Sequence, residues 1–232
     1  INFTIHANEN VGLVGLNGSG KTTIIKLLLR LYDPTSGAVL INGIDIREIP
    51  HTEYIKHIGI ILQDFYVFAF SVRENIAFDR PFDETLCVSS LQKAGVYDRV
   101  ANLQRGINTA MYKYCDENGV ELSGGENQKL CIARSIYKKP DLMVMDEPSS
   151  TLDPLAEYQL FHDLIGLSDQ KATLFISHRL SSTVSCDRII VLSEGRIAEI
   201  GNHDELIKNK GLYSELFQIQ ASYYEKEVQN EA

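Results

Sequence analysis

Positive charge is scarce in this sequence. Its 232 residues include 22 lysines and arginines against 31 aspartates and glutamates, which gives a formal net charge of −9 at pH 7. Nucleic-acid-binding proteins usually carry a basic face that meets the phosphate backbone. The composition therefore argues against a nucleic-acid partner.

Paired cysteines and long apolar runs are also missing. The four cysteines are scattered and none belongs to a C-x-x-C pair, which favours reduced cytosolic thiols over a disulfide framework or a zinc site. They are Cys87, Cys115, Cys131 and Cys186. No apolar run reaches the roughly 18 residues expected of a membrane-spanning helix. The chain opens on Ile1 and not on methionine, so we expect it to be a segment of a longer protein.

The most informative stretch is a glycine-rich motif at residues 15–22. Its sequence, GLNGSGKT, fits the phosphate-binding P-loop pattern G-x-x-x-x-G-K-[ST]. The glycines let backbone N–H groups turn inward around an anion, and Lys21 adds a charge that can reach the β- and γ-phosphates. The Thr22 hydroxyl is a hard oxygen ligand suited to Mg²⁺. The residues predicted to bind the nucleotide here are Gly15, Asn17, Gly18, Ser19, Gly20, Lys21, Thr22 and Thr23.

The surroundings of this motif support the prediction. An apolar stretch at 11–14 predicts a short buried strand before it, and residues 23–31 predict a helix after it. The helix N-terminus adds partial positive charge where the phosphates would lie. The motif thus has the strand–loop–helix context that a P-loop requires.

The rest of the N-terminal part alternates strand and turn signals. Residues 1–5 alternate apolar and polar side chains, which predicts a half-buried strand. Residues 39–46 carry Asn42-Gly43 between apolar neighbours and predict a hairpin. A buried strand is predicted at 57–62, directly before Gln63.

The middle of the chain has a helical pattern. Residues 83–103 predict helix with Asp83 as the N-cap. We expect residues 68–140 to form a mostly helical lobe. The residues on either side of it, 1–67 and 141–232, would together form the core with a β subdomain. The whole chain would then be a single domain of residues 1–232.

The C-terminal part returns to strands. An apolar run at 142–145 ends in Asp146-Glu147, and a strand buried on both faces suits the middle of a parallel sheet. A further strand at 173–177 ends directly before His178. A hairpin is predicted at 188–200, followed by helices that begin near residues 204 and 211.

A second candidate anion site lies at Leu122-Ser123-Gly124-Gly125-Glu126. Ser123 is a good N-cap for the helix that follows, and the two glycines leave the backbone N–H groups uncovered. The residues by themselves favour neither a phosphate site nor an ordinary capped helix.

This segment resembles the LSGGQ signature of the ABC (ATP-binding cassette) ATPases, and the order of P-loop, signature and acidic strand matches that family. Gln63 resembles the family's Q-loop glutamine, residues 150–153 its D-loop and His178 its switch histidine. The resemblance covers essentially the whole chain. Gln63-Asp64, the aromatic residues after them, residues 71–76 and the stretch 116–121 look most like the cassettes of exporters. The implied fold is α/β: a P-loop NTPase core with a mixed β-sheet, an antiparallel β subdomain and an inserted helical lobe.

The resemblance also implies roles in ATP hydrolysis. Thr22 and Gln63 would ligate Mg²⁺, with Asp146 holding the ion through water. Glu147 would act as general base for the attacking water, and His178 would hydrogen-bond the γ-phosphate. From the residues alone, Gln63 could instead cap its strand and Glu147 could be a solvated loop acid. Asp153 would cap a helix and face a partner chain.

The resemblance further implies partners. Two cassettes, identical or different, would pack head to tail, with each ATP between the P-loop of one chain and Ser123, Gly124 and Gly125 of the other. A transmembrane domain fused N-terminal to this segment would place the cassette at the cytoplasmic face of the cell membrane, where hydrolysis would power export. The alternative is a soluble ABC ATPase without a transmembrane partner. The acidic balance, the single cassette and the lack of heptads after Gln63 argue against ribosomal and chromosome-maintenance relatives. Glu147 and His178 together argue against a regulatory module without turnover.

The sequence departs from the family pattern in two ways, and it also contains a cluster of aromatic residues. Glu126 stands where the signature has glutamine, and we expect this acid to weaken the phosphate contact. The printed chain begins too close to the P-loop to include the family's adenine-stacking aromatic residue, so we expect weak ATP binding and poor discrimination against GTP. Such stacking contributes about 1–3 kcal/mol per base in nucleic-acid binding. The aromatic residues between Phe65 and Phe70 suit either a helical core or a groove for a transmembrane domain.

Overall fold

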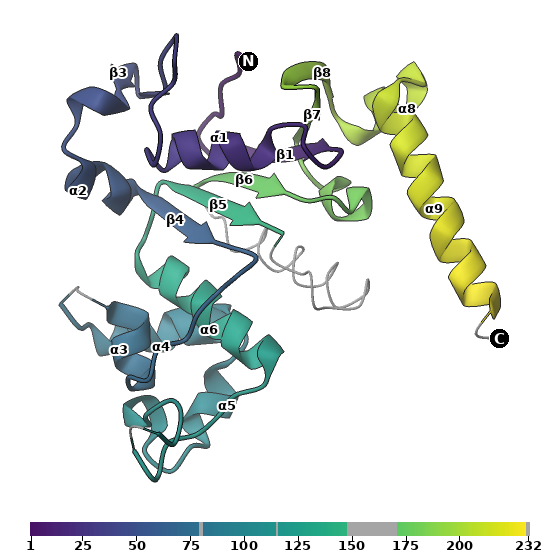
Figure 1. Ribbon diagram of the computed structural model, residues 1–232. Coiled ribbons are helices and arrows are strands. Elements are labelled where there is room, and N and C mark those ends of the chain that lie inside the picture. The colour runs from purple at the N-terminus through teal and green to yellow at the C-terminus, as the bar shows by residue number, and fades with distance from the viewer. Residues whose placement is uncertain (79–80, 115, 148–170, 231–232) are drawn as a thin grey trace.

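A six-stranded sheet forms the centre of the computed structural model, which describes residues 1–78, 81–114, 116–147 and 171–230 (Figure 1). The strand order is β4-β5-β6-β1-β7-β8, and all strands but the last run parallel. The strands are β1 (Asn10–Gly15), β4 (Ile58–Ile61), β5 (Leu142–Asp146), β6 (Ala172–Ile176), β7 (Arg188–Ser193) and β8 (Arg196–Gly201). The mixed sheet is confirmed, as is the interior place of β5.

Side chains of the sheet alternate between two apolar cores because successive residues of a strand point to opposite faces. Val14, Met145 and Phe175 join one core. Their neighbours Leu13, Val144 and Leu174 join the other core. A sheet that is covered on both faces explains why its strands read as continuous apolar runs.

One face is covered by α1 (Lys21–Leu28), α2 (His51–Tyr54) and a small separate hairpin. The hairpin pairs β2 (Leu40–Ile41) with β3 (Ile44–Asp45). Asn42 and Gly43 form its turn with φ angles of 50° and 82°, the left-handed pair that a tight hairpin requires. The predicted hairpin is therefore confirmed.

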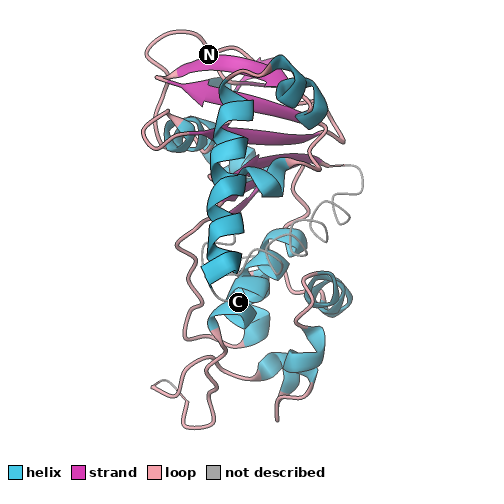
Figure 2. Cartoon of the chain, turned by 90° about the vertical axis from the view of Figure 1, so that its right-hand side faces the viewer, coloured by secondary structure: helices cyan, strands magenta, loops and turns pink. Residues whose placement is uncertain are grey.

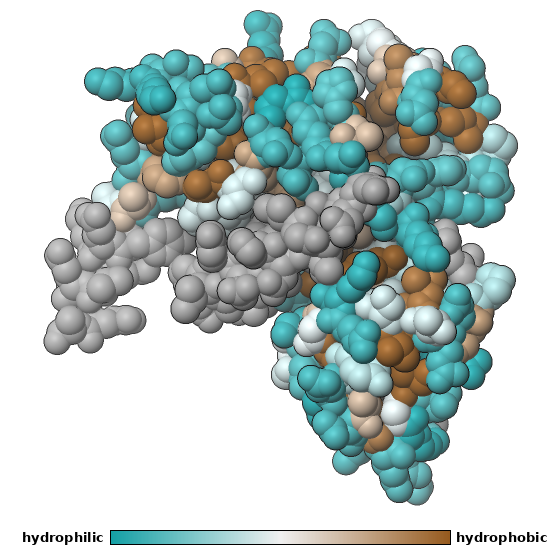
Figure 3. Space-filling model, turned by 180° about the vertical axis from the view of Figure 1, so that it is seen from behind, coloured by the Kyte–Doolittle hydropathy of each residue, from teal (hydrophilic) through white to brown (hydrophobic). Residues whose placement is uncertain are grey.

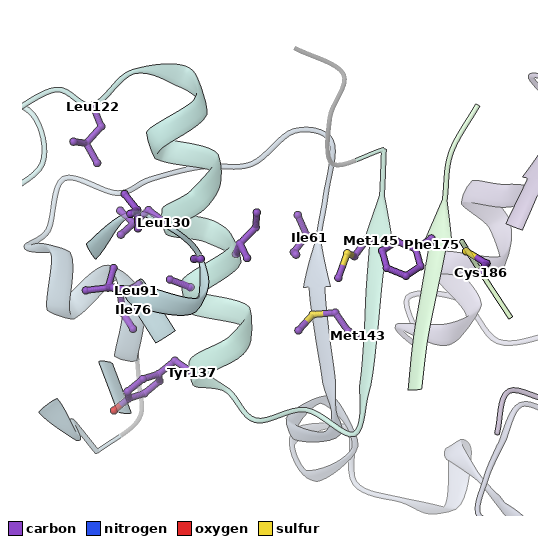
Figure 4. Close-up of a cluster of buried hydrophobic side chains, with 14 of the residues drawn as sticks. Ile61, Ile76, Leu91, Leu122, Leu130, Tyr137, Met143, Met145, Phe175 and Cys186 are labelled. Carbon is purple, nitrogen blue, oxygen red and sulfur yellow. The ribbon is translucent and has the colours of Figure 1, made fainter. Parts of the chain in front are cut away.

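On the other face α6 (Gly124–Tyr137) packs against β4, and α3 (Val72–Ala77) and α4 (Glu84–Lys93) pack on α6, with α5 (Tyr97–Ala101) next to α4. Asp83 caps α4 as predicted, and its side chain accepts a hydrogen bond from the Leu86 N–H. Leu91 and Leu130 of these helices belong to the same core as Met145 and Phe175 of the sheet (Figure 4). The helical part is thus joined to the sheet by continuous apolar packing, and its separation as a lobe stays a prediction.

The chain ends in α8 (His203–Asn209) and α9 (Leu212–Asn230). Both helices lie on the side of the sheet toward which the β5 and β6 arrows point, and the C-terminal end of α9 projects away from the sheet (Figures 1 and 2). The Glu199 carboxylate accepts hydrogen bonds from the N–H groups of Leu212 and Tyr213 at 2.6 and 3.3 Å, which caps α9. Among the described residues, no helix is long and apolar enough to span a bilayer.

Residues 1–5 do not form the predicted strand. Phe3 and Ile5 pack against the α1-side core without pairing to a neighbouring strand. The alternating pattern therefore reports burial of one side of the segment and not a hydrogen-bonded ladder.

The other side-chain expectations concern the cysteines and the aromatic residues. Cys87, Cys131 and Cys186 are buried free thiols, and Cys115 lies outside the described residues. Of the aromatic side chains near Gln63, Tyr66 and Phe70 are 70% and 51% exposed, which does not fit a helical core. Apolar side chains also reach the surface elsewhere on the helical part (Figure 3).

Candidate nucleotide-binding and catalytic site

The P-loop connects β1 to α1. At two of its positions the backbone conformation is one that only glycine adopts without strain. Gly15 has a φ of 153°, and a Cβ there would lie 2.4 Å from the Leu192 carbonyl oxygen. Gly20 has a φ of 108° and serves as the N-cap of α1, with no side chain to cap the first N–H groups of the helix. These N–H groups, together with the helix dipole, make the loop a suitable site for an anion.

Lys21 lies within this loop and is only 8% exposed. Its Nζ donates hydrogen bonds to the carbonyl oxygens of Gly15 and Leu16 at 2.7 and 3.2 Å. Burial lowers the pKa of the ammonium, while the carboxylates of Glu147 and Asp146 oppose the shift. Ser19 Oγ is also buried and has no hydrogen-bond partner among the described residues. A desolvated cation and an orphaned hydroxyl in one loop fit a phosphate group as the missing partner.

Asp146 and Glu147 end β5 beside this loop. Burial raises the pKa of Asp146 to about 6, with a further rise from the Glu147 carboxylate and an opposing effect of Lys21. Glu147 has a φ of 46°, so the extended strand stops at this residue, while its N–H still bonds to the Ile176 carbonyl at 2.9 Å. The left-handed turn at Glu147 ends the extended backbone, and both successive carboxylates act on the charge of Lys21.

Glu147 and His178 meet across the ends of β5 and β6. Glu147 Oε1 lies 3.0 Å from His178 Nδ1. The contact follows from the sheet, because β5 and β6 are adjacent and parallel with Asp146 opposite Ile176. A carboxylate oxygen 3.0 Å from an imidazole nitrogen is suitably placed for moving a proton.

A cleft of about 340 Å³ lies between the P-loop and the Glu147–His178 pair. Its lining includes Gly15 and Asn17 of the P-loop, Glu147 and His178. Leu216 and Gln220 of α9 form another wall, and the sequence did not predict them. Their segment indicated only a helix, because nothing in a local pattern shows where a helix docks.

The other predicted residues of this region, Lys21 and Asp146 among them, do not line this cleft. Thr22 and Thr23 are exposed at the start of α1, and Gln63 is exposed just after β4, the neighbour of β5. The D-loop segment 150–153, with Asp153, lies outside the described residues. Among the residues that the structure does describe, no group of three or more His, Cys, Asp or Glu forms a metal site.

The second glycine motif begins α6. Ser123 accepts a hydrogen bond from the Glu126 N–H, and the Glu126 carboxylate accepts one from the Ser123 N–H at 2.8 Å, which makes a capping box. Glu126 also pairs with Arg99 Nε at 3.0 Å. The hydrogen bond from the Ser123 backbone, followed by the Ser123 side chain and then Arg99, lowers the pKa of the Glu126 carboxyl. Gly124 and Gly125 have open space beside them. None of these residues lines the cleft.

Comparison with known proteins agrees with this geometry. Residues 1–150 match the family model described as "ABC transporter". The chain belongs to the ABC transporter family. This ABC transporter chain is 40% identical over 224 residues to an ATP-dependent lipid A-core flippase of Cupriavidus pinatubonensis, covering 95% of this chain and 37% of the flippase. It is 36% identical over 221 residues to the ATP-binding cassette sub-family B member 6 of Mesocricetus auratus, covering 95% of this chain and 26% of the relative.

A solved structure shows the same fold as this ABC transporter chain. It is described as a bacterial Atm1-family ABC exporter with ATP bound, and it aligns with a TM-score of 0.85 and 36% identity. The alignment covers 94% of this chain and 38% of the exporter chain. The ABC transporter chain thus spans between about a quarter and two fifths of the length of these relatives.

Proposed function

We propose that this chain binds ATP with Mg²⁺ in the cleft and hydrolyses it to drive export across a membrane. The observation that carries the proposal is the contact between Glu147 and His178 at 3.0 Å, beside the buried ammonium of Lys21. The base and its polar partner line one cleft, and the cation belongs to the P-loop, whose Gly15 and Asn17 line the same cleft. Phosphoryl transfer requires mainly such positioning and charge stabilisation.

Each group has a distinct task in the proposed reaction. Lys21 and the P-loop N–H groups hold the β- and γ-phosphates, and the loop exchanges its internal hydrogen bonds for bonds to phosphate oxygens. Glu147 accepts a proton from the attacking water. His178 orients the Glu147 carboxylate and hydrogen-bonds the γ-phosphate.

Magnesium fits the oxygen groups around the cleft. The Thr22 hydroxyl, the Gln63 amide oxygen and the Asp146 carboxylate are hard ligands, with Asp146 acting through water. Mg²⁺ is commonly held by one or two protein oxygens together with substrate phosphates, so no dense acidic cluster is required. The bound ion would offset the negative charge of the phosphates.

The signature motif supports a paired arrangement of two cassettes. Ser123 and Gly124 are exposed at the N-terminus of a 14-residue helix, outside the cleft of their own chain. The Glu126 carboxylate turns back onto Ser123 and Arg99, which reduces the repulsion that this acid would exert on a phosphate. A head-to-tail dimer would bring the uncovered N–H groups of one chain to the nucleotide of the other.

Similarity to exporters supports a membrane partner. The relatives include a flippase and an ABC exporter, each much longer than this chain. We place the cassette at the cytoplasmic face of a membrane, coupled to a transmembrane domain fused on its N-terminal side. The exposed aromatic side chains Tyr66, Phe68 and Phe70 are suited to contact that domain.

Replacement of the base tests the proposal. Glu147→Gln keeps the size of the side chain but removes its ability to accept a proton. We expect phosphate release to fall by about 100-fold or more, while ATP binding persists and a dimer accumulates in light scattering with Mg²⁺ and ATP. The exposed Glu48 provides the matched control Glu48→Gln, which should hydrolyse ATP at the wild-type rate. An unchanged rate in Glu147→Gln would refute the assigned role.

A further inference from the structure

One side chain of the C-terminal helix holds the loop that carries His178. Gln220 Nε2 donates a hydrogen bond to the His178 carbonyl oxygen at 2.5 Å. Gln220 Oε1 accepts one from the Leu180 N–H at 2.9 Å. The amide orientation is determined by its partners, because a carbonyl requires a donor and an N–H requires an acceptor.

The loop needs this contact because it pairs only part of its backbone internally. Ser177 Oγ accepts a hydrogen bond from the Arg179 N–H at 2.9 Å and donates one to the Arg179 carbonyl at 3.1 Å. Gln220 forms hydrogen bonds with the two groups on either side of Arg179, the His178 carbonyl and the Leu180 N–H. Gln220 therefore restrains the backbone at His178 itself and at Leu180, two residues further along the chain.

The helix that supplies Gln220 is itself firmly attached. Glu199 of β8 caps its first turn, and the Tyr213 hydroxyl lies 2.9 Å from His203 Nδ1. Tyr213 is fully buried, and Leu216, one turn before Gln220, packs against the core and lines the cleft. The amide thus extends from a fixed support, and not from a mobile terminus.

Within the part of the chain that the structure describes, the polar partner of the His178 side chain is Glu147. The His178 side chain is 49% exposed, and its contact with Glu147 joins two titratable groups across the cleft. A shift of the 177–179 backbone would move Nδ1 away from the carboxylate. We propose that Gln220 is a positioning residue for His178, so that the docking of α9 sets the geometry of the Glu147–His178 pair. This inference rests on the proposed function of that pair.

The test compares three variants of the full chain. Gln220→Leu removes both hydrogen bonds, and Gln220→Glu keeps the shape of the side chain but replaces the donor facing the His178 carbonyl with an acceptor. Gln218→Leu is the matched control, since Gln218 is exposed on the same helix. Misplacement of a reacting group by about 1 Å can cost about 100-fold in rate. We expect kcat for ATP to fall about 10- to 100-fold in both Gln220 variants, with KM changed much less because the P-loop is intact.

A double-substitution cycle separates positioning from general destabilisation. In a His178→Ala background, Gln220→Leu should cause no further loss of rate, because the residue that it positions is gone. An equal further loss would overturn the inference, and so would wild-type kcat in Gln220→Leu. Wild-type kcat in Gln220→Glu would assign the effect to packing and would likewise overturn it.

Two readouts do not depend on turnover. Amide exchange at Leu180 should be faster in Gln220→Leu, and the ¹⁵N signals of the His178 imidazole, assigned through His178→Ala, should shift. Both should be unchanged in Gln218→Leu. If the wild type does not hydrolyse ATP, the proposed function fails, and these readouts still decide whether Gln220 positions His178. Unchanged exchange and imidazole signals in Gln220→Leu would contradict it.

Discussion

Arg134 of α6 is a single side chain that ties the exposed aromatic segment to the helices. Its guanidinium donates to the Asn75 carbonyl at 2.7 Å, to Asn75 Oδ1 at 3.0 Å and to the Tyr66 carbonyl at 3.1 Å. It also lies 5.5 Å from the ring centroids of Phe68 and Phe78. Burial lowers the pKa of the guanidinium, which shows that the charge depends on these partners for compensation.

Replacement of this side chain should be among the more costly changes at the surface of the helical part. Arg134→Met keeps the apolar stem but removes the guanidinium donors from the carbonyl oxygen and Oδ1 of the fully buried Asn75. Among the described residues, Oδ1 keeps only the Phe68 N–H as a donor. A lost hydrogen bond to a charged group costs about 1.5–3 kcal/mol, and the bonds of one side chain are not additive. Each ring contact adds about 0.5–1 kcal/mol. After the desolvation of the guanidinium is regained, we expect a net destabilisation of about 3 kcal/mol.

Arg134→Lys should cost about 2 kcal/mol, because an ammonium cannot reproduce the planar fork that serves three acceptors. For a chain of this length, 1 kcal/mol lowers Tm by about 2–4 °C, so Arg134→Met should unfold about 6–12 °C below the wild type.

Unfolding can be followed by tyrosine fluorescence in urea, since the chain has 11 tyrosines and no tryptophan. Lys129→Met is the control on the same helix, where the exposed ammonium makes one long contact of 3.4 Å to the Gly95 carbonyl. We expect the control to change the free energy of unfolding by less than about 0.5 kcal/mol. A change below about 1 kcal/mol in Arg134→Met would refute the assignment of Arg134 as a structural tie.

Three further predictions concern the P-loop, the signature and α9. Lys21→Met should leave the Tm of the ATP-free chain nearly unchanged, because the buried ammonium is costly to desolvate, but should abolish the rise in Tm caused by Mg²⁺ and ATP; a persistent rise would contradict the phosphate role. Glu126→Gln should lose at most about 1 kcal/mol of stability at pH 7, since the pKa of this carboxyl is lowered from 4.5. The contribution is present above pH 4.5 and disappears as the pH falls through the lowered pKa, so a wild-type advantage that grows in acid would disprove it. Gly211→Ala places a Cβ 1.9 Å from Glu199 Oε1, and should cost about 1–2 kcal/mol in urea unfolding by displacing the cap of α9; a neutral result would argue against that cap.

Several features could be predicted from the sequence because they depend on near neighbours. The P-loop conformation follows from glycines at Gly15 and Gly20, where any other side chain meets the backbone or an unfavourable φ. The capping box of α6 needs only Ser123 and a glutamate three residues later. The strands were found because a sheet covered on both faces requires apolar runs. Residues 1–5 were the exception, since alternation records burial and not strand pairing.

Other features were decided by tertiary structure alone. Glu147 meets His178 because β5 and β6 are neighbours in the sheet, and strand order is not written in either segment. Glu126 is neutralised by Arg99 because α5 packs near the start of α6. Gln220 reaches the His178 loop because α9 docks beside the carboxyl ends of the strands. The sequence by itself therefore predicted a P-loop and candidate residues for hydrolysis, because these signals are short-range. Which of those residues touch, and what holds them in place, depended on long-range packing.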